Sequence, residues 1–155
     1  MNERLFRQAM GKFATGVTVV ATEVDRKVHG MTANAFMSVS LNPTLLVVSI
    51  AEKAQMLEYM KKSKQFSVNI LSAEQKELSM IFAGQLKENR EVSFDQLGGV
   101  PVLPGAIAQV VCEVSAAHVE GDHTLFIGKV KEIQVNEHRG EPLIYYSGQY
   151  RSLAE

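Results

Sequence analysis

The stretch VHGMTANAFMSVSLNP, residues 28–43, is the part of the chain around which we expect the fold to be organised. It begins as a strand, breaks at the small residues TANA at positions 32–35, and ends at Pro43. Small side chains let a ligand come close to the main chain, and backbone N–H groups in such a bend suit a phosphate or the polar edge of a flat ring. Loops of this composition are also common in ordinary hairpins, so the stretch alone leaves both interpretations open.

Strands are predicted on both sides of this stretch. The β-branched run before it pairs with its first residues as a hairpin, and the apolar run LLVVSI after it predicts a strand covered on both faces. Alternating apolar residues predict further strands at 66–71, 106–116 and 124–135, and a last strand is expected at 143–147 after a turn. In the strand at 124–135 the apolar residues change parity, so we expect a β-bulge near Lys131 and Glu132 to restore the register.

Three short helices complete the predicted elements. Asn2 is a suitable N-cap for the first, whose apolar residues recur at helical spacing and which we expect to end at Gly16. A second is expected at 55–62, and a third follows the capping box of Ser72 and Gln75. Sequential strands with few helices predict a mainly β (α+β) fold, an antiparallel barrel with short capping helices, in a single domain at residues 1–155.

Composition and charge exclude several classes of protein. Of the 155 residues 46% are hydrophobic and 21% are charged, as in an ordinary globular protein. The formal net charge of −1 without a basic block argues against nucleic-acid binding, and no apolar run approaches the roughly 20 residues that span a membrane. Cys112 is the single cysteine, which indicates a reducing cytoplasm. Its place in an alternating strand predicts a small core residue and not a reactive thiol.

Familiar catalytic motifs are absent. The sequence contains neither of the two usual glycine-rich nucleotide loops, no G-x-S-x-G elbow, and no His/Cys/carboxylate cluster at metal spacing, so we expect no metal site. Asp122 and His123 are neighbours, but side chains of adjacent residues in an extended chain point to opposite faces. We therefore do not expect them to form a ready-made acid–base dyad.

A family resemblance gives these features a context. The chain resembles the short-chain flavin reductases, the NADH-dependent partners of two-component aromatic monooxygenases of the phenol and 4-hydroxyphenylacetate hydroxylase type. The resemblance covers essentially the whole chain, in the order FRQAMGKFATGVTVVAT, GMTANAFMSVSLNP, VSI-A-x-K, FSVNIL, FAG, GDHTLFIG and YYSGQYRSL. The strongest pair of motifs is GMTANAF with GDH.

The resemblance implies an FMN-binding split barrel that works as a homodimer, with the flavin near the subunit interface. By position, the isoalloxazine and ribityl groups would lie beside Met31, Thr32, Ala33 and Asn34. The ribityl–phosphate portion would lie at Ser49, Ile50, Ala51 and Lys53, with Met56 close by. The adenylate part of FAD would lie beside Phe82, Ala83 and Gly84. The nicotinamide would lie beside Gly121, Asp122 and His123, and part of the pocket wall would be Tyr146.

The implied activity is hydride transfer from NADH to FAD, or to FMN, and release of reduced flavin to a separate monooxygenase. The cofactor performs the reaction, so the protein has to supply positioning. We expect His123 to contact NADH or the flavin edge without an obligatory proton transfer, and Lys53 to be a phosphate ligand or a plain surface lysine. One alternative is a non-enzymatic flavin-binding or electron-carrier module. Another, a pyridoxamine-phosphate-oxidase-like enzyme, would need a basic cluster that we do not find.

Overall fold

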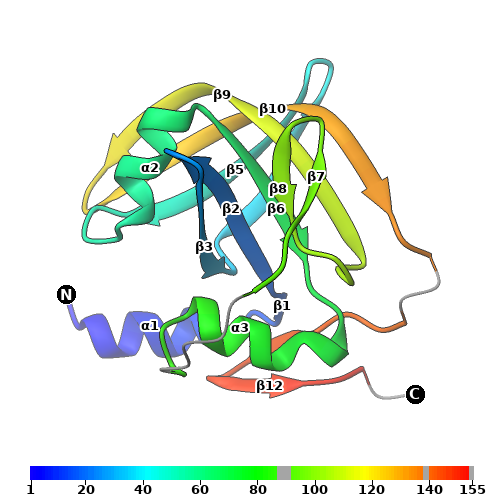
Figure 1. Ribbon diagram of the computed structural model, residues 1–155. Helices are drawn as coiled ribbons and strands as arrows, with labels where there is room; N and C mark the ends of the chain where they lie inside the picture. Colours follow the sequence, from blue (N-terminus) through cyan, green and yellow to red (C-terminus); the bar gives the residue numbers. More distant parts are fainter. Residues whose placement is uncertain (87–91, 138–139, 154–155) are drawn as a thin grey trace.

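A single curled antiparallel sheet dominates the computed structural model, which describes residues 1–86, 92–137 and 140–153 (Figure 1). Its seven strands, in order across the sheet, are β3 (Lys27–Ala33), β2 (Thr18–Val24), β6 (Gln65–Ile70), β9 (Ala108–Glu120), β10 (His123–Val135), β5 (Thr44–Ala51) and β4 (Phe36–Leu41). The two outermost strands, β3 and β4, follow each other in the chain and are joined only by Asn34 and Ala35. The bend predicted from sequence therefore lies where the two ends of the sheet meet. No pairing joins β3 to β4 among the described residues, so this is a seam and not a closed ladder.

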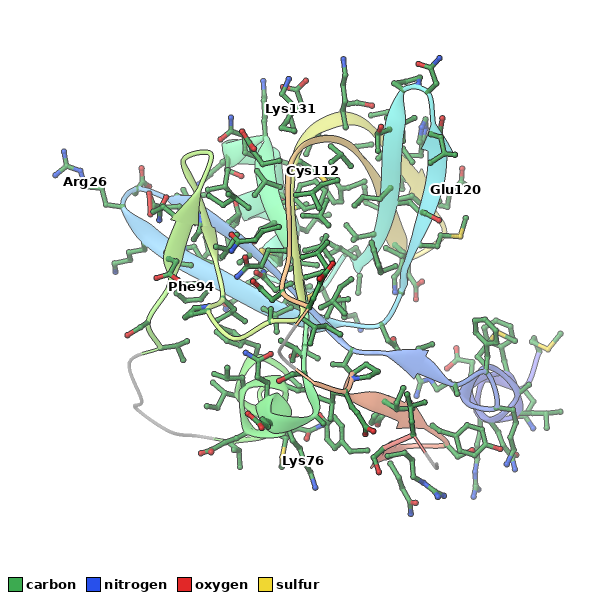
Figure 2. All side chains as sticks on the ribbon, turned by 90° about the vertical axis from the view of Figure 1, so that its right-hand side faces the viewer. Arg26, Lys76, Phe94, Cys112, Glu120 and Lys131 are labelled. Atoms are coloured by element: carbon green, nitrogen blue, oxygen red, sulfur yellow. The ribbon has the colours of Figure 1, made fainter. Side chains whose placement is uncertain are left out.

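The space inside the sheet is filled by one apolar core. Val48, Phe66 and Phe126 are fully or almost fully buried there, and helix α2 (Met56–Ser63) adds Met56, Leu57 and Met60. Cys112 lies in this core with no exposed surface, as predicted, and Figure 2 shows it among the side chains enclosed by the sheet. Burial raises the pKa of the Cys112 thiol to about 12, so this thiol is not a nucleophile.

The pairing of β9 with β10 slips twice. One slip lies between Val130 and Glu132, which confirms the predicted bulge. The other, between Ile127 and Gly128, was not predicted from sequence. A Cβ atom on Gly128 would lie 2.7 Å from Cζ of Phe66, closer than real Cβ contacts come, so only glycine fits at this second slip.

A second layer lies beneath the curled sheet in Figure 1. It contains α1 (Glu3–Gly11), β1 (Thr15–Gly16), the short 3₁₀ helix η1 (Ala73–Gln75), α3 (Lys76–Phe82), β11 (Ile144–Tyr146) and β12 (Gln149–Arg151). A small hairpin, β7 (Asp95–Leu97) and β8 (Val100–Val102), packs beside β6. In the described part of the chain no helix is long and apolar enough to cross a membrane.

The predicted helix caps are present, but the first helix is shorter than predicted. Asn2 Oδ1 accepts from the Leu5 amide at 3.1 Å, and the capping box of Ser72 and Gln75 is complete. Helix α1 ends at Gly11 and not at Gly16, because the chain then turns into β1. No residue of α1 is buried, so its apolar face is not covered by the chain itself.

Candidate functional site

The bend at residues 32–35 is fastened to the strands around it. The amide of Ser49 donates to Ala35 O and the amide of Phe36 to Asn34 O, both at 3.0 Å. The hydroxyl of Thr18 donates to Ala33 O at 2.6 Å. These bonds hold the bend against β2 and β5, and they bring the predicted site residues around Asn34 close to Ser49.

A groove of about 760 Å³ opens on one side of this bend, a volume typical of ligand pockets. Its wall is mostly apolar, with Asn34 and Ser49 among its few polar residues. The remaining lining residues are Phe13, Ala14, Thr15, Gly16, Thr18, Ala35, Phe36, Met37, Val47, Ile70 and Leu125. An apolar wall with a few polar groups suits a flat aromatic ring that has one polar edge.

A smaller cavity of about 160 Å³ lies on the other side of Asn34. Thr32 and Asn34 line it together with Tyr145 and Tyr150, whose rings meet edge to face at 5.3 Å. The Tyr150 hydroxyl and the Ser79 hydroxyl lie 2.7 Å apart, and Thr32 Oγ1 donates to Ser79 O at 2.6 Å. Asn34 therefore lies between two hollows, and the smaller one is braced by α3 and β12.

A third hollow, of about 450 Å³, lies between β3, α2 and the end of α3. Five predicted residues from distant parts of the sequence line it together, namely Met31, Met56, Phe82, Ala83 and Gly84. Sequence reasoning missed two aromatic residues in its wall, His29 and Tyr59, whose rings stack 3.6 Å apart and nearly parallel, at 10°. Burial, and to a lesser extent the charge of Lys27, lowers the pKa of His29, which favours the neutral ring at neutral pH.

The predicted nicotinamide-side residues form the turn between β9 and β10. Gly121 has a positive φ of 62°, and Glu52 N donates to Asp122 O at 2.9 Å. His123 Nδ1 lies 2.8 Å from Asp122 Oδ1. The expectation that these two side chains point apart was wrong, because Asp122 lies in a turn and not in an extended strand. The hydrogen bond with His123 and then its charge lower the pKa of Asp122, and Lys53 adds a smaller attraction.

Three predicted residues are placed differently from the rest. The Ile50 side chain is fully buried in the core, so only its main chain is available to a ligand. Lys53 is exposed in the turn after β5. Lys12 Nζ and Arg151 Cζ each lie 5.9 Å from the ring centroid of Tyr146, whereas its neighbour Tyr145 lines the small cavity. No local pattern distinguishes the two tyrosines, since their faces depend on the pairing of β11 with β1.

The donor set fits the flavin that the sequence motifs imply. The large groove offers apolar walls for ring faces, and Asn34 and Ser49 offer polar atoms beside them. The groove wall also contains Thr15, whose buried hydroxyl has no hydrogen-bond partner among the described residues. A polar atom left unpaired beside an apolar groove is consistent with a ligand that pairs with it.

Comparison with known proteins gives matches over almost the whole chain. The model of the "Flavin reductase like domain" family matches residues 10–154. An NADH-dependent flavin reductase of Rhodococcus sp is 44% identical over 150 residues, covering 95% of this chain and 84% of the relative. The reductase component of 4-hydroxyphenylacetate 3-monooxygenase of Thermus thermophilus is 36% identical over 148 residues, covering 96% of this chain and 95% of the relative.

Solved structures agree with these matches. The flavin reductase PheA2 in its native state has a TM-score of 0.97 and 59% sequence identity, covering 100% of both chains. The styrene monooxygenase flavin reductase of Pseudomonas putida S12 has a TM-score of 0.89 and 34% identity, covering 97% of this chain and 98% of the other. The mainly β fold predicted from sequence is thereby confirmed.

Proposed function

Because this chain belongs to the flavin reductase like domain family, we propose that it is an NADH-dependent flavin reductase. It transfers a hydride from NADH to a flavin and releases the reduced flavin for a separate monooxygenase component. Relatives named as monooxygenase reductase components support this role over that of a non-enzymatic carrier. The observation that best supports the site is the hydrogen-bonded bend at residues 32–35, because Asn34 in this bend lines both the large groove and the small cavity.

The flavin is held along β3 and the end of β5. When bound, it supplies the hydride acceptor. Asn34 and Ser49 hold its polar edge, Ile50 and Ala51 contribute main-chain groups, and Lys53 meets the phosphate. Such fixed donors stabilise the negative charge that develops on a reduced ring, because they need no reorientation during the reaction.

His123 and Asp122 act on the nicotinamide side. Asp122 accepts from His123 Nδ1–H and so fixes the tautomer of the imidazole, which leaves Nε2 free for a contact with NADH. The Asp122 side chain is 84% exposed and the His123 side chain is 45% exposed, so both are accessible to a co-substrate that has to enter and leave. His123 thus orients the hydride donor, and no proton needs to move through it.

FAD is the preferred flavin, with FMN also accepted. FAD differs from FMN by an adenylate group, whose purine can stack on aromatic rings. The third hollow offers such rings in Phe82 and in the His29–Tyr59 stack, and it adjoins the bend through Met31.

The enzyme acts as a homodimer. The apolar face of α1 is uncovered, and Phe13 after it is 77% exposed. Leu41 on β4 is 92% exposed and Val119 on β9 is 73% exposed. Large apolar surfaces of this kind are covered in stable oligomers. Light scattering coupled to gel filtration measures the mass, and a monomer at micromolar concentration would contradict the dimer.

The cytoplasmic location stays a prediction from the single cysteine.

The activity is tested by mixing purified protein with NADH and FAD under anaerobic conditions. We expect the near-ultraviolet band of NADH and the visible band of FAD to fall together, one flavin per NADH. Reduced flavin should then pass an ultrafiltration membrane that retains the protein, which shows release. Quenching of flavin fluorescence without NADH oxidation would instead identify a flavin-binding module. Parallel runs with NADPH, FMN and riboflavin define the preferred substrates.

A further inference from the structure

One buried polar atom in the wall of the large groove has no partner. Across residues 1–86, 92–137 and 140–153, Thr15 Oγ1 is the single buried side-chain nitrogen or oxygen atom found without a hydrogen bond. Folded proteins pair the great majority of such atoms, and an exception calls for a physical explanation. Thr15 lines the same 760 Å³ groove as Asn34 and Ser49.

Other hydroxyls near the bend show that this fold can satisfy such groups. Thr18 Oγ1 donates to Ala33 O and Thr32 Oγ1 donates to Ser79 O, each at 2.6 Å. Thr18 also lines this groove, but its hydroxyl already donates to Ala33 O. The unpaired state of Thr15 is therefore particular to its position.

The main chain of Thr15 is fixed while its hydroxyl is not. Strand β1 pairs Thr15 with Tyr145, which anchors the backbone. The next residue is Gly16, and an added Cβ there would meet nothing within 4 Å, so the neighbouring space is open. A 120° rotation about the Cα–Cβ bond brings the threonine hydroxyl to the position that its methyl group held and moves the methyl group to the position of the Cβ hydrogen. This rotation breaks no hydrogen bond, because the hydroxyl makes none.

We propose that the Thr15 hydroxyl turns into the groove and hydrogen-bonds the polar edge of the flavin ring. The wall around it is apolar, with Phe36, Val47 and Leu125 suited to the ring faces. A hydroxyl can donate or accept, so it can serve a ring carbonyl or a ring N–H. Thr15 is thus a third polar contact in the groove, beside Asn34 and Ser49. This inference rests on the proposed function, since it presupposes that a flavin binds here.

The test compares Thr15→Val, which removes the hydroxyl at nearly constant shape, with Thr15→Ser, which keeps it. Fluorescence quenching measures the dissociation constants of FMN and riboflavin, and circular dichroism measures the melting temperature of the flavin-free protein. We expect Thr15→Val to raise both dissociation constants by about 3- to 10-fold, the loss typical of one hydrogen bond. Its melting temperature should be equal to that of the wild type or higher, because an unpaired buried group is gone. Thr15→Ser should bind within about twofold of the wild type.

Each other outcome overturns the inference. If Thr15→Val melts at a lower temperature and binds flavin unchanged, the hydroxyl is structural. If its main effect is on the oligomer mass measured by light scattering, the groove is covered by a second copy of the chain. If it affects FMN but not riboflavin, the contact is to the phosphate and not to the ring. Thr15→Ala repeats the comparison if valine packs poorly. A wild-type protein that quenches no flavin would refute the proposed function itself, whereas equal binding by wild type and Thr15→Val refutes only the role of Thr15.

Discussion

Replacing Gly30 by alanine should reshape the hollow that we assign to the adenylate group. Gly30 lies in β3 without a positive φ, so alanine brings no backbone strain there. Its added Cβ would lie 2.8 Å from both Cδ1 and Cε1 of Phe82 and 3.3 Å from Cγ1 of Val19. The change is therefore a steric one, and it falls mainly on the Phe82 ring in the wall of the 450 Å³ hollow.

The size of the effect follows from these distances. Carbon atoms in contact usually lie about 3.5–4.0 Å apart, so the Phe82 ring has to move away by roughly 0.7–1.2 Å. Overpacking of this kind costs about 1–3 kcal/mol. Phe82 is only half-buried and can move, so we expect the lower half of that range in stability. The displaced ring should weaken FAD binding by about 10-fold, equivalent to about 1.4 kcal/mol, and leave FMN binding within about twofold.

Urea denaturation measures the stability, and fluorescence quenching measures the affinities for FAD and FMN. Gly16→Ala is the matched control for stability, because its Cβ would meet nothing within 4 Å. Phe82→Leu replaces the displaced ring by a smaller side chain. The double variant Gly30→Ala/Phe82→Leu should therefore be more stable than the sum of the two single changes predicts. Additive single effects, or FAD and FMN weakened equally by Gly30→Ala, would refute the reasoning.

Three further variants or conditions test the remaining assignments. Tyr59→Leu removes the stacking partner of His29 and should weaken FAD binding by about 2- to 10-fold while FMN is unaffected, and an equal loss of both in titrations would contradict the adenylate assignment. His123→Ala should raise the KM for NADH more than the flavin dissociation constant, so parallel losses in steady-state kinetics and quenching would rule out a role on the nicotinamide side. Cys112 should resist maleimide until the protein unfolds. Because burial raises its pKa from 9.0 to about 12, the unfolded chain loses this proton first, and the free energy of unfolding should fall as the pH rises through that window. Urea denaturation measures this free energy of unfolding across the pH window, in the wild type and in Cys112→Ala. A wild-type value that does not fall relative to that of Cys112→Ala would exclude this contribution.

Much of the local structure follows from nearest neighbours in the chain. Asn2 and the capping box of Ser72 and Gln75 act within one turn of helix, so they were predictable. The change of parity near Lys131 similarly predicted a bulge, because alternation along one strand records which face is buried. The second slip, at Gly128, was not predictable, since the need for glycine arises from Phe66 on another strand.

The site residues also divide into those that sequence motifs predicted and those that only contacts between distant segments bring together. The motifs assigned Asn34 and Ser49 to neighbouring parts of one flavin, which stays a prediction. In the structure both residues line the same groove, because the bend is hydrogen-bonded to the strand that contains Ser49. Sequence reasoning missed Tyr59 beside His29, since their stacking depends on where α2 lies over β3.

Local sequence patterns were enough to predict the mainly β fold, the helix caps, the buried thiol and the family. These depend on periodicity and short motifs, which act between residues close in the chain. Only the tertiary structure decided that Asp122 turns onto His123, that the apolar face of α1 stays uncovered and that the Thr15 hydroxyl has no partner. The first is set by the geometry of the turn between β9 and β10. The other two depend on which distant segments lie opposite a side chain, and strand register sets that arrangement.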